Sequence, residues 1–322
     1  MSTGFKLDAN LGGFAATVQG MTITETRTVR FRNRSELLAL PPTQLGFEPH
    51  ESIVALRMSG KEVVFTARLD IAYVQASCIA AAQQISVMAA SNPAPDSHWL
   101  LLCYTASPNS GASVTTRLAE ELDAVSLMFL TDGASTWEVV DGIPIEEESV
   151  ELSSELRRDL AELRSRAVEP SRQEAIACVY RWQPSKQRLA EARRRIRGLQ
   201  DEGRLRQLRT LVDADSLTDT QAAELAVLLS YEEMFGEMVA QLSTETASNR
   251  RTALLAARVQ APARSLTNVL SLLALAYWLE GDGSLAAECL TQLGGSVRTH
   301  PLARTVAAML QLGIPPSRWD EH

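Results

Sequence analysis

The chain has 322 residues, of which 45% are apolar, and a formal net charge of −8. This length is typical of two domains, and the apolar fraction is that of ordinary globular proteins, which excludes a generally disordered chain. The acidic balance works against binding to nucleic acid or to anionic lipid, except where the chain concentrates basic residues.

Cysteine and histidine residues are few and widely separated. The cysteines are Cys78, Cys103, Cys178 and Cys289, and the histidines are His50, His98, His300 and His322. Because no CxxC pair or metal-ligand spacing occurs, we expect buried, reduced thiols and neither a metal nor a cofactor. The first twenty residues do not resemble a signal peptide, and apolar stretches such as 269–279 are too short to cross a bilayer. We therefore expect a cytoplasmic protein with no membrane partner.

The first 145 residues alternate between strand and helix patterns. Residues 1–21 contain many Gly, Ser and Thr breaks and are expected to form a flexible or loosely docked arm. Ser59-Gly60-Lys61 predicts a hairpin turn, and Pro41-Pro42 is expected to stop a short helix. In chain order we predict strands at 22–32, 52–58, 62–69, 99–105, 125–130 and 136–140, and helices at 36–40, 72–90 and 112–122.

After Pro144 the composition changes, and we find no convincing strand from there to the end. Leu152, Leu156, Leu160 and Leu163 share one face of an amphipathic helix. Further helices are predicted at about 172–181, 185–200, 204–212, 220–231, 232–243, 249–259, 268–280, 284–293 and 302–312. The fold class is therefore α+β/α: an N-terminal α/β sandwich with a mixed sheet over 22–145, followed by an all-helical C-terminal array over 146–322.

Gly281 and Gly283 belong to a segment whose sequence matches a nucleotide-binding motif. Gly281-Asp282-Gly283-Ser284-Leu285-Ala286 matches the G-x-G-x-x-A pattern of dinucleotide binding. That motif follows a strand, whereas the residues before Gly281 have a helical pattern, so we interpret these glycines as the break between two helices. Signatures of P-loops, serine hydrolases, zinc proteases and kinases are absent.

Three polar residues lie at predicted strand ends. Arg68 and Asp70 flank Leu69, so alternation places them on one face of the sheet, and Asp132 ends another strand. Strand ends are where α/β folds bind ligands, so these residues are candidates for a small polar ligand. The favoured alternative is an Arg–Asp ion pair that only fixes a loop.

A single stretch of the chain, from Lys186 to Arg209, is strongly basic. It includes the candidate surface residues Arg193, Arg194, Arg195 and Arg197. No aromatic residue within the stretch could stack on bases, and the arginines point in several directions. A solvated face, or one paired with the acidic segment 146–162, is therefore favoured over a nucleic-acid site.

Segments at both ends of the chain resemble one family. The pattern Leu45-Gly46-Phe47-Glu48-Pro49, the run Val64–Asp70, the segment Leu272–Ala286 and the final Gly313-Ile314-Pro315-Pro316 are similar to the actinobacterial domain of unknown function 4192 family. Differences in the middle of the chain would suit a phage or mobile-element copy. The resemblance implies a bacterial, cytosolic protein of two parts and brings no transferable activity.

Three hypotheses of function follow. The first is a non-enzymatic protein-interaction, assembly or regulatory protein, because no catalytic constellation is apparent. The second is a small-ligand-binding protein or enzyme with its site at Arg68, Asp70 and Asp132. The third is a nucleic-acid-associated protein that uses the basic helix 186–209. We rank them in this order, with a protein as the expected partner and an enzyme less expected than not.

Overall fold

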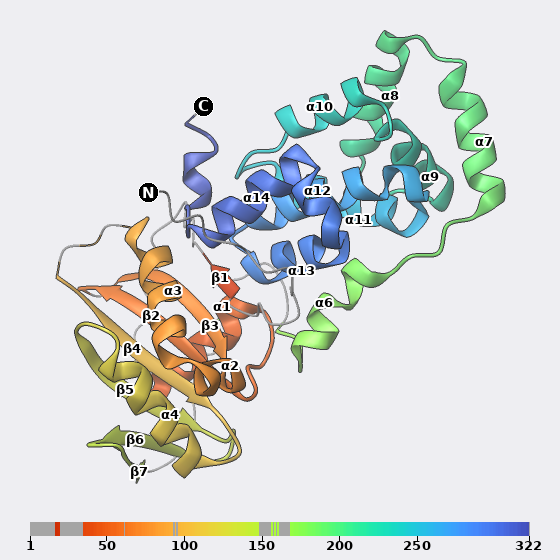
Figure 1. The fold of residues 1–322 in the computed structure, drawn as a ribbon. Coiled ribbons are helices and arrows are strands. Elements are labelled where there is room, and N and C mark those ends of the chain that lie inside the picture. The colour runs from red at the N-terminus through yellow and green to blue at the C-terminus, as the bar shows by residue number, and fades with distance from the viewer. Residues whose placement is uncertain are drawn as a thin grey trace.

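The computed structural model describes residues 17–19, 35–60, 62–92, 94, 96–147, 156, 158, 160 and 168–321. They form a mixed sheet with helices on both faces, followed by an array of helices (Figure 1). This architecture confirms the predicted α+β/α fold class. Within these residues, none of the helices has the length and apolar character needed to cross a membrane.

Seven strands form one sheet in the order β1-β3-β2-β4-β5-β6-β7. Neighbouring strands are antiparallel except β4 and β5, which run parallel and are joined through α4. β1 lies within the range expected to be an arm, while the strand predicted at 22–32 lies outside the described residues. The strands are β1 (Thr17–Gln19), β2 (Ser52–Ser59), β3 (Glu62–Asp70), β4 (Ser97–Tyr104), β5 (Val125–Thr131), β6 (Thr136–Val140) and β7 (Ile143–Glu147).

Strand β7 shows that the prediction of no strand after Pro144 is wrong. Proline lacks an N–H, but an edge strand tolerates it because one side of that strand needs no ladder partner. Ile143 and Ile145 are 63% and 51% exposed, so β7 has no buried face that would produce a clear apolar alternation. The sheet consequently extends two residues beyond the predicted domain boundary at 145.

Two helical layers cover the sheet. On one face lie α2 (Ile71–Ala76), α3 (Cys78–Ala90) and α4 (Pro108–Glu120), packed on a core that includes Phe65 and Leu101. Ser77 divides the single helix predicted at 72–90, because its side chain accepts a hydrogen bond from the backbone N–H of Ala80 and so caps α3. On the other face, Leu45 and Phe47 pack against Val54 and Phe129.

The predicted effect of Pro41-Pro42 is wrong. A 3₁₀ helix, η1 (Ser35–Ala39), is followed directly by α1 (Leu40–Leu45), which begins at these prolines instead of ending there. Proline is tolerated in the first turn of a helix, because the N–H groups of that turn have no partner within the helix. Helix α1 ends at Gly46, whose φ of 79° is left-handed and whose N–H bonds the Pro42 carbonyl.

The C-terminal half confirms the predicted helices from 172 onward. They are α6 (Arg172–Tyr180), α7 (Lys186–Arg197), α8 (Asp201–Val212), α9 (Asp219–Leu228), α10 (Glu232–Ala240), α11 (Ala247–Gln260), α12 (Ala263–Leu279), α13 (Gly283–Leu293) and α14 (Pro301–Gln311), with 3₁₀ turns η2 (Gly294–Arg298) and η3 (Pro316–Arg318). Helix α12 is buried over most of its length and forms the centre of the array. Of the helix predicted over Leu152–Leu163, residues 156, 158 and 160 are described and are helical.

The helical array folds back onto the α/β domain. A parallel β-bridge joins Phe47 to Glu169, with the Glu48 N–H 2.9 Å from the Glu169 carbonyl and the Glu169 N–H 2.9 Å from the Gly46 carbonyl. Nearby, β1 contacts α13, and the two elements lie side by side in Figure 1. We call this contact region, together with α6, the domain junction.

Candidate functional site

Arg68 and Asp70 lie on one face of β3, as alternation predicts. Phe65, Ala67 and Leu69 point toward the layer of α2, α3 and α4. Arg68 points the other way, toward the domain junction, where its guanidinium carbon lies 5.9 Å from the centre of the Phe47 ring. Arg68 Nη2 lies 2.7 Å from Asp70 Oδ1, so the two residues form an ion pair.

The guanidinium of Arg68 is buried but only partly bonded. The residue is 5% exposed. Besides Asp70, its Nη2 has only a long contact of 3.4 Å to the His50 carbonyl oxygen. Its Nε and Nη1 are buried and have no hydrogen-bond partner among the residues that the structure describes. Buried arginine nitrogens are normally paired, so these two are donors for which the described part of the fold supplies no acceptor.

Ser52 adds a hydroxyl to the same face. It is the register partner of Asp70 in the β2–β3 pair, which places it diagonally across from Arg68, with side chains about 7–8 Å apart. Ser52 is fully buried, and its Oγ likewise has no hydrogen-bond partner in the described part of the chain. Two neighbouring residues of the sheet thus direct unpartnered donors toward the junction.

Arg172 brings a second guanidinium from the helical domain. It is the first residue of α6, and its Nη2 lies 2.7 Å from Glu288 Oε2 on α13. Tyr180, in the last turn of α6, donates its hydroxyl to the other Glu288 oxygen. The Nε of Arg172 is buried and unpartnered. We call Ser52, Arg68, Asp70, Arg172 and Glu288 the junction cluster.

The charges of the junction cluster act on one another. Burial lowers the pKa of Arg68, the Asp70 carboxylate partly offsets this effect, and the positive charge of Arg172 lowers the pKa further. On the other side of the cluster, the hydrogen bond to Glu288 raises the pKa of Tyr180 to about 12. The repulsion from Arg172 is the weakest of these effects on Arg68, and the Arg172 side chain is 33% exposed.

The loop that carries Phe47 and His50 is held by Glu51. Its carboxylate accepts hydrogen bonds from Thr105 Oγ1 at 3.1 Å and from the Ala106 N–H at 2.9 Å. Its φ of 40° is left-handed, which is uncommon for a residue with a side chain. Such backbone strain is kept only where the surrounding contacts enforce it, and here they tie the start of β2 to the end of β4.

Asp132 lies at the same end of the strands as Asp70 but outside the junction cluster. Register pairs Asp70 with Ser52, Ser52 with Tyr104 and Tyr104 with Thr131, so three strand spacings, about 14 Å, separate Asp70 from the end of β5. Asp132 Oδ1 accepts the N–H groups of Ala134 and Ser135 at 2.9 and 2.8 Å. These bonds lower its pKa and make it a turn residue.

The basic helix α7 is divided into paired and unpaired arginines. Arg195 Nη1 lies 2.6 Å from Glu224, and Arg188 binds Asp219 at 2.9 Å. Arg193, Arg194 and Arg197 are exposed and, within the part of the chain that the structure describes, form no ion pair. In Figure 1, α7 and α8 lie at the end of the array farthest from the sheet.

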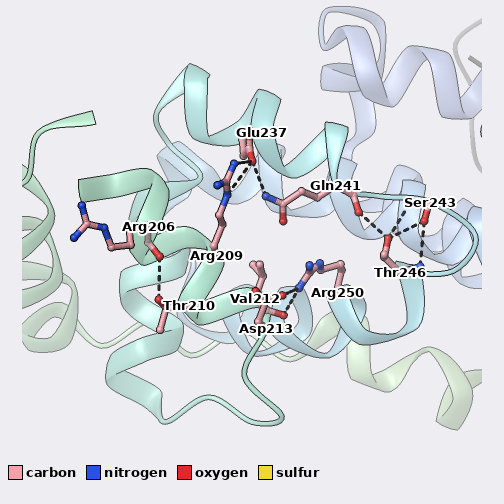
Figure 2. Close-up of polar contacts among 10 residues, drawn as sticks. All are labelled: Arg206, Arg209, Thr210, Val212, Asp213, Glu237, Gln241, Ser243, Thr246 and Arg250. Atoms are coloured by element: carbon pink, nitrogen blue, oxygen red, sulfur yellow. Dashed lines mark hydrogen bonds and ion pairs between the residues drawn. The ribbon is translucent and has the colours of Figure 1, made fainter. Parts of the chain in front are cut away.

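A shallow hollow of about 340 Å³ runs along α8, lined by Glu202, Leu205, Arg206, Arg209, Thr210 and Asp213. Figure 2 shows that Arg209 crosses to Glu237 of α10 and that Asp213 receives Arg250 of α11. The side chain of Arg206 instead points away from these pairs. Two of the four charged residues that line the hollow, Arg209 and Asp213, therefore connect α8 to its neighbours.

One polar network resembles a catalytic triad. His300 Nδ1 lies 3.1 Å from Ser271 Oγ, and His300 Nε2 lies 3.2 Å from Asn268 Oδ1. Ser271 is fully buried, however, and His300 Nδ1 also accepts the N–H of Ala303 at 3.3 Å. A nucleophile must be reachable by its substrate, so this network is best explained as the N-cap of α14.

The domain arrangement can now be compared with known proteins. A family model described as Domain of unknown function (DUF4192) matches residues 35–317, which is most of the chain. The chain belongs to the DUF4192 family. No curated protein and no solved structure matches it.

Two of the segments on which the DUF4192 resemblance rests lie at the domain junction. Gly46-Phe47-Glu48 forms the bridge to Glu169, and Val64–Asp70 carries Arg68. Asp282 N-caps α13 by accepting the N–H of Leu285 at 3.2 Å, so Gly281 and Gly283 separate two helices, as the sequence predicts. The Gly313 segment contacts the end of α3.

Sequence reasoning misses Ser52, Arg172 and Glu288. Arg172 and Glu288 are 116 residues apart, and each follows an ordinary helical pattern. Only the fold brings them to Arg68. A charged Glu288 on the buried face of α13, amid Leu285 and Cys289, is the one local signal that could have indicated a site.

Proposed function

We propose that this chain is a non-enzymatic regulatory protein that binds a small oxyanion at the junction cluster. The observation that carries the proposal is Arg68, a buried guanidinium with two nitrogens that find no partner among the described residues and with the charge of Arg172 acting on it. We therefore favour ligand binding, the second hypothesis from the sequence, over protein interaction. No particular residue supports protein interaction.

Energetics favour a ligand at this position. A buried, unsatisfied N–H costs about 1–3 kcal/mol, and more when the group is charged. Asp70 neutralises the charge of Arg68 but occupies only Nη2. An acceptor placed among Arg68 Nε and Nη1, Arg172 Nε and Ser52 Oγ would recover several such bonds at once.

The donors define the chemical class. Guanidinium and hydroxyl groups both donate to the oxygens of carboxylates and phosphoryl groups. Asp70 and Glu288 already balance the two arginines, which favours an anion of low charge. Because Arg68 belongs to β3 and Arg172 to α6, such an anion would hold the two domains together, and this linkage is a means of regulation.

Thermal unfolding in a series of anions tests the proposal. Sodium phosphate and sodium acetate are compared at constant ionic strength for the wild type, Arg68→Met and Arg264→Met. Arg264 is exposed and lies outside the junction cluster, so it is the matched control. A ligand at one hundred times its Kd stabilises the folded state by about 2.7 kcal/mol.

We expect saturable stabilisation by at least one of the two anions in the wild type and in Arg264→Met, and none in Arg68→Met. Ser52→Ala should weaken it without removing it. If Arg68 only fixes the loop, Arg68→Met lowers Tm equally in all salts, and that result contradicts the proposal.

A second candidate function is binding of a nucleic-acid backbone by α7. It is supported by the three exposed arginines that form no ion pair with a described carboxylate, while Arg188 and Arg195 on the same helix are paired. The binding would be electrostatic and without base recognition.

A further inference from the structure

We infer that Arg258 and Gln292 form a second anion site, separate from the junction cluster, which takes a small monovalent anion such as chloride. Arg258 lies in the last turn of α11, and Gln292 lies near the end of α13. The inference does not depend on the proposed function, because no residue is shared between the two sites.

Arg258 is a buried cation without a carboxylate. It is 5% exposed, and its only side-chain hydrogen bond to a described residue runs from Nη2 to Gln292 Oε1 at 2.9 Å. Nε and Nη1 of Arg258 and the amide nitrogen of Gln292 are all buried and have no partner in the described ranges. Among the residues that the structure describes, no acidic side chain pairs with Arg258.

Nearby groups do not supply the missing negative charge. Burial lowers the pKa of Arg258, and the adjacent Cys289 only partly opposes this effect. Burial also raises the pKa of the Cys289 thiol well above its usual value, so this thiol is neutral at pH 7. A buried guanidinium that stays charged requires a partner, and one monovalent anion would neutralise it.

The alternative explanation is that Arg258 caps the end of its own helix. Cations are favoured there by the helix dipole. The carbonyls at this end already have other donors, however: the Gln183 N–H bonds Val259 at 2.8 Å, and Trp182 Nε1 bonds Ala261 at 2.8 Å. The Arg258 carbonyl accepts the Ala261 N–H at 3.4 Å. The Arg258 side chain makes no such bond, so capping does not explain its burial.

The geometry also fits a small anion. Gln292 Oε1 accepts a hydrogen bond from Arg258 Nη2. This bond brings the amide nitrogen of Gln292 beside the guanidinium of Arg258. An ion in contact with both would accept from an amide N–H and a guanidinium N–H. Gln292 itself is partly exposed, so the site lies near the surface of α13.

Chloride titration tests this site. Tm is measured while sodium chloride replaces sodium gluconate at constant ionic strength, for the wild type, Arg258→Met, Gln292→Leu, Arg68→Met and Arg264→Met. We expect a saturable rise of Tm in the wild type, Arg68→Met and Arg264→Met. The rise should vanish in Arg258→Met, and Gln292→Leu should raise the half-saturating chloride concentration roughly tenfold.

Two results would overturn the inference. One is a chloride response of Arg258→Met that parallels the wild type. The other is a Tm of Arg258→Met that is higher than that of the wild type at every chloride concentration. That result would identify Arg258 as an unpaired charge with no ligand. If Arg258→Met does not fold, crystals of the wild type grown in sodium bromide decide the matter, since the inference requires a bromide anomalous peak between Arg258 and Gln292.

Discussion

Asn92 and Gly313 are 221 residues apart in the chain, yet Asn92 Nδ2 donates a hydrogen bond of 3.0 Å to the Gly313 carbonyl. Beside it, Ser91 Oγ donates to the carbonyl of Leu312. Asn92 follows the end of α3 in the α/β domain, and Gly313 follows α14 in the helical array. These bonds hold the two domains together at a second place, distinct from the Phe47–Glu169 bridge.

Replacing Gly313 with alanine should open this contact. Gly313 has a φ of 63°, and a Cβ there would lie 2.2 Å from the backbone oxygen of Met88. Since backbone atoms cannot turn aside as side chains do, we expect a loss of more than about 2 kcal/mol in the free energy of unfolding. Urea denaturation followed by tryptophan fluorescence measures it. Gly295→Ala is the control, because no atom lies within 4 Å of a Cβ there; equal stability of the two variants would refute the contact.

His300 should make the protein less stable as the pH falls. Burial lowers its pKa from the usual value of 6.5, so the unfolded chain takes up a proton before the folded protein does. Stability is therefore complete above about pH 6.5 and declines as the pH falls through the folded pKa. His300→Asn keeps an N-cap side chain but cannot titrate, so its free energy of unfolding should change less between pH 7 and 5. His98→Gln is the control, and a slope in His300→Asn equal to that of the wild type would disprove the assignment.

One of the four cysteines should react quickly. The sequence predicts buried thiols throughout, but Cys178 is exposed, and that prediction is wrong for this residue. Burial raises the pKa of Cys103 to about 12 and that of Cys289 well above its usual value, so both remain unreactive thiols. Titration of the native protein with an aromatic disulfide reagent at pH 7 should show one rapid thiol, which Cys178→Ser abolishes. Two or more rapid thiols would contradict the burial of the other three.

The exposed arginines of α7 can be tested separately from the paired ones. If α7 binds a phosphate backbone, affinity for a single-stranded oligonucleotide falls steeply with salt, and replacing Arg193, Arg194 and Arg197 with Gln lowers the slope by about two to three. Arg195→Gln should leave the slope nearly unchanged, because Glu224 already holds that side chain. Fluorescence anisotropy at several salt concentrations measures both. A flat salt dependence in the wild type would remove this candidate function.

The elements that the sequence predicts well are those with strong local patterns. The hairpin of β2 and β3 is marked by two strand-like runs on either side of Gly60, and helices such as α7 and α14 carry a clear apolar periodicity. Predictions fail where the surrounding structure, and not the local sequence pattern, determines how an element begins or ends. Pro41 and Pro42 start α1, Ser77 breaks one helix into two, and β7 is too short and exposed to show a pattern.

The candidate site is only half visible in the sequence. Two residues apart in one strand, Arg68 and Asp70 share a face by simple alternation, and the structure pairs them. Asp132 lies at the same end of the strands, but three strand spacings separate it from Asp70. Only the strand order reveals this separation. Arg172 and Glu288 reach the site through the docking of two domains, and no local pattern encodes that docking.

Isothermal titration of phosphate and of acetate into the wild type, Arg68→Met and Arg264→Met tests the central claim most directly. We predict saturable binding to one high-affinity site for at least one of the two anions, equal in the wild type and Arg264→Met, and at least tenfold weaker in Arg68→Met, since a charge-assisted hydrogen bond contributes about 1.5–3 kcal/mol. Equal affinity in all three proteins, or no saturable heat with either anion in the wild type, would contradict the assignment of the junction cluster as an oxyanion site.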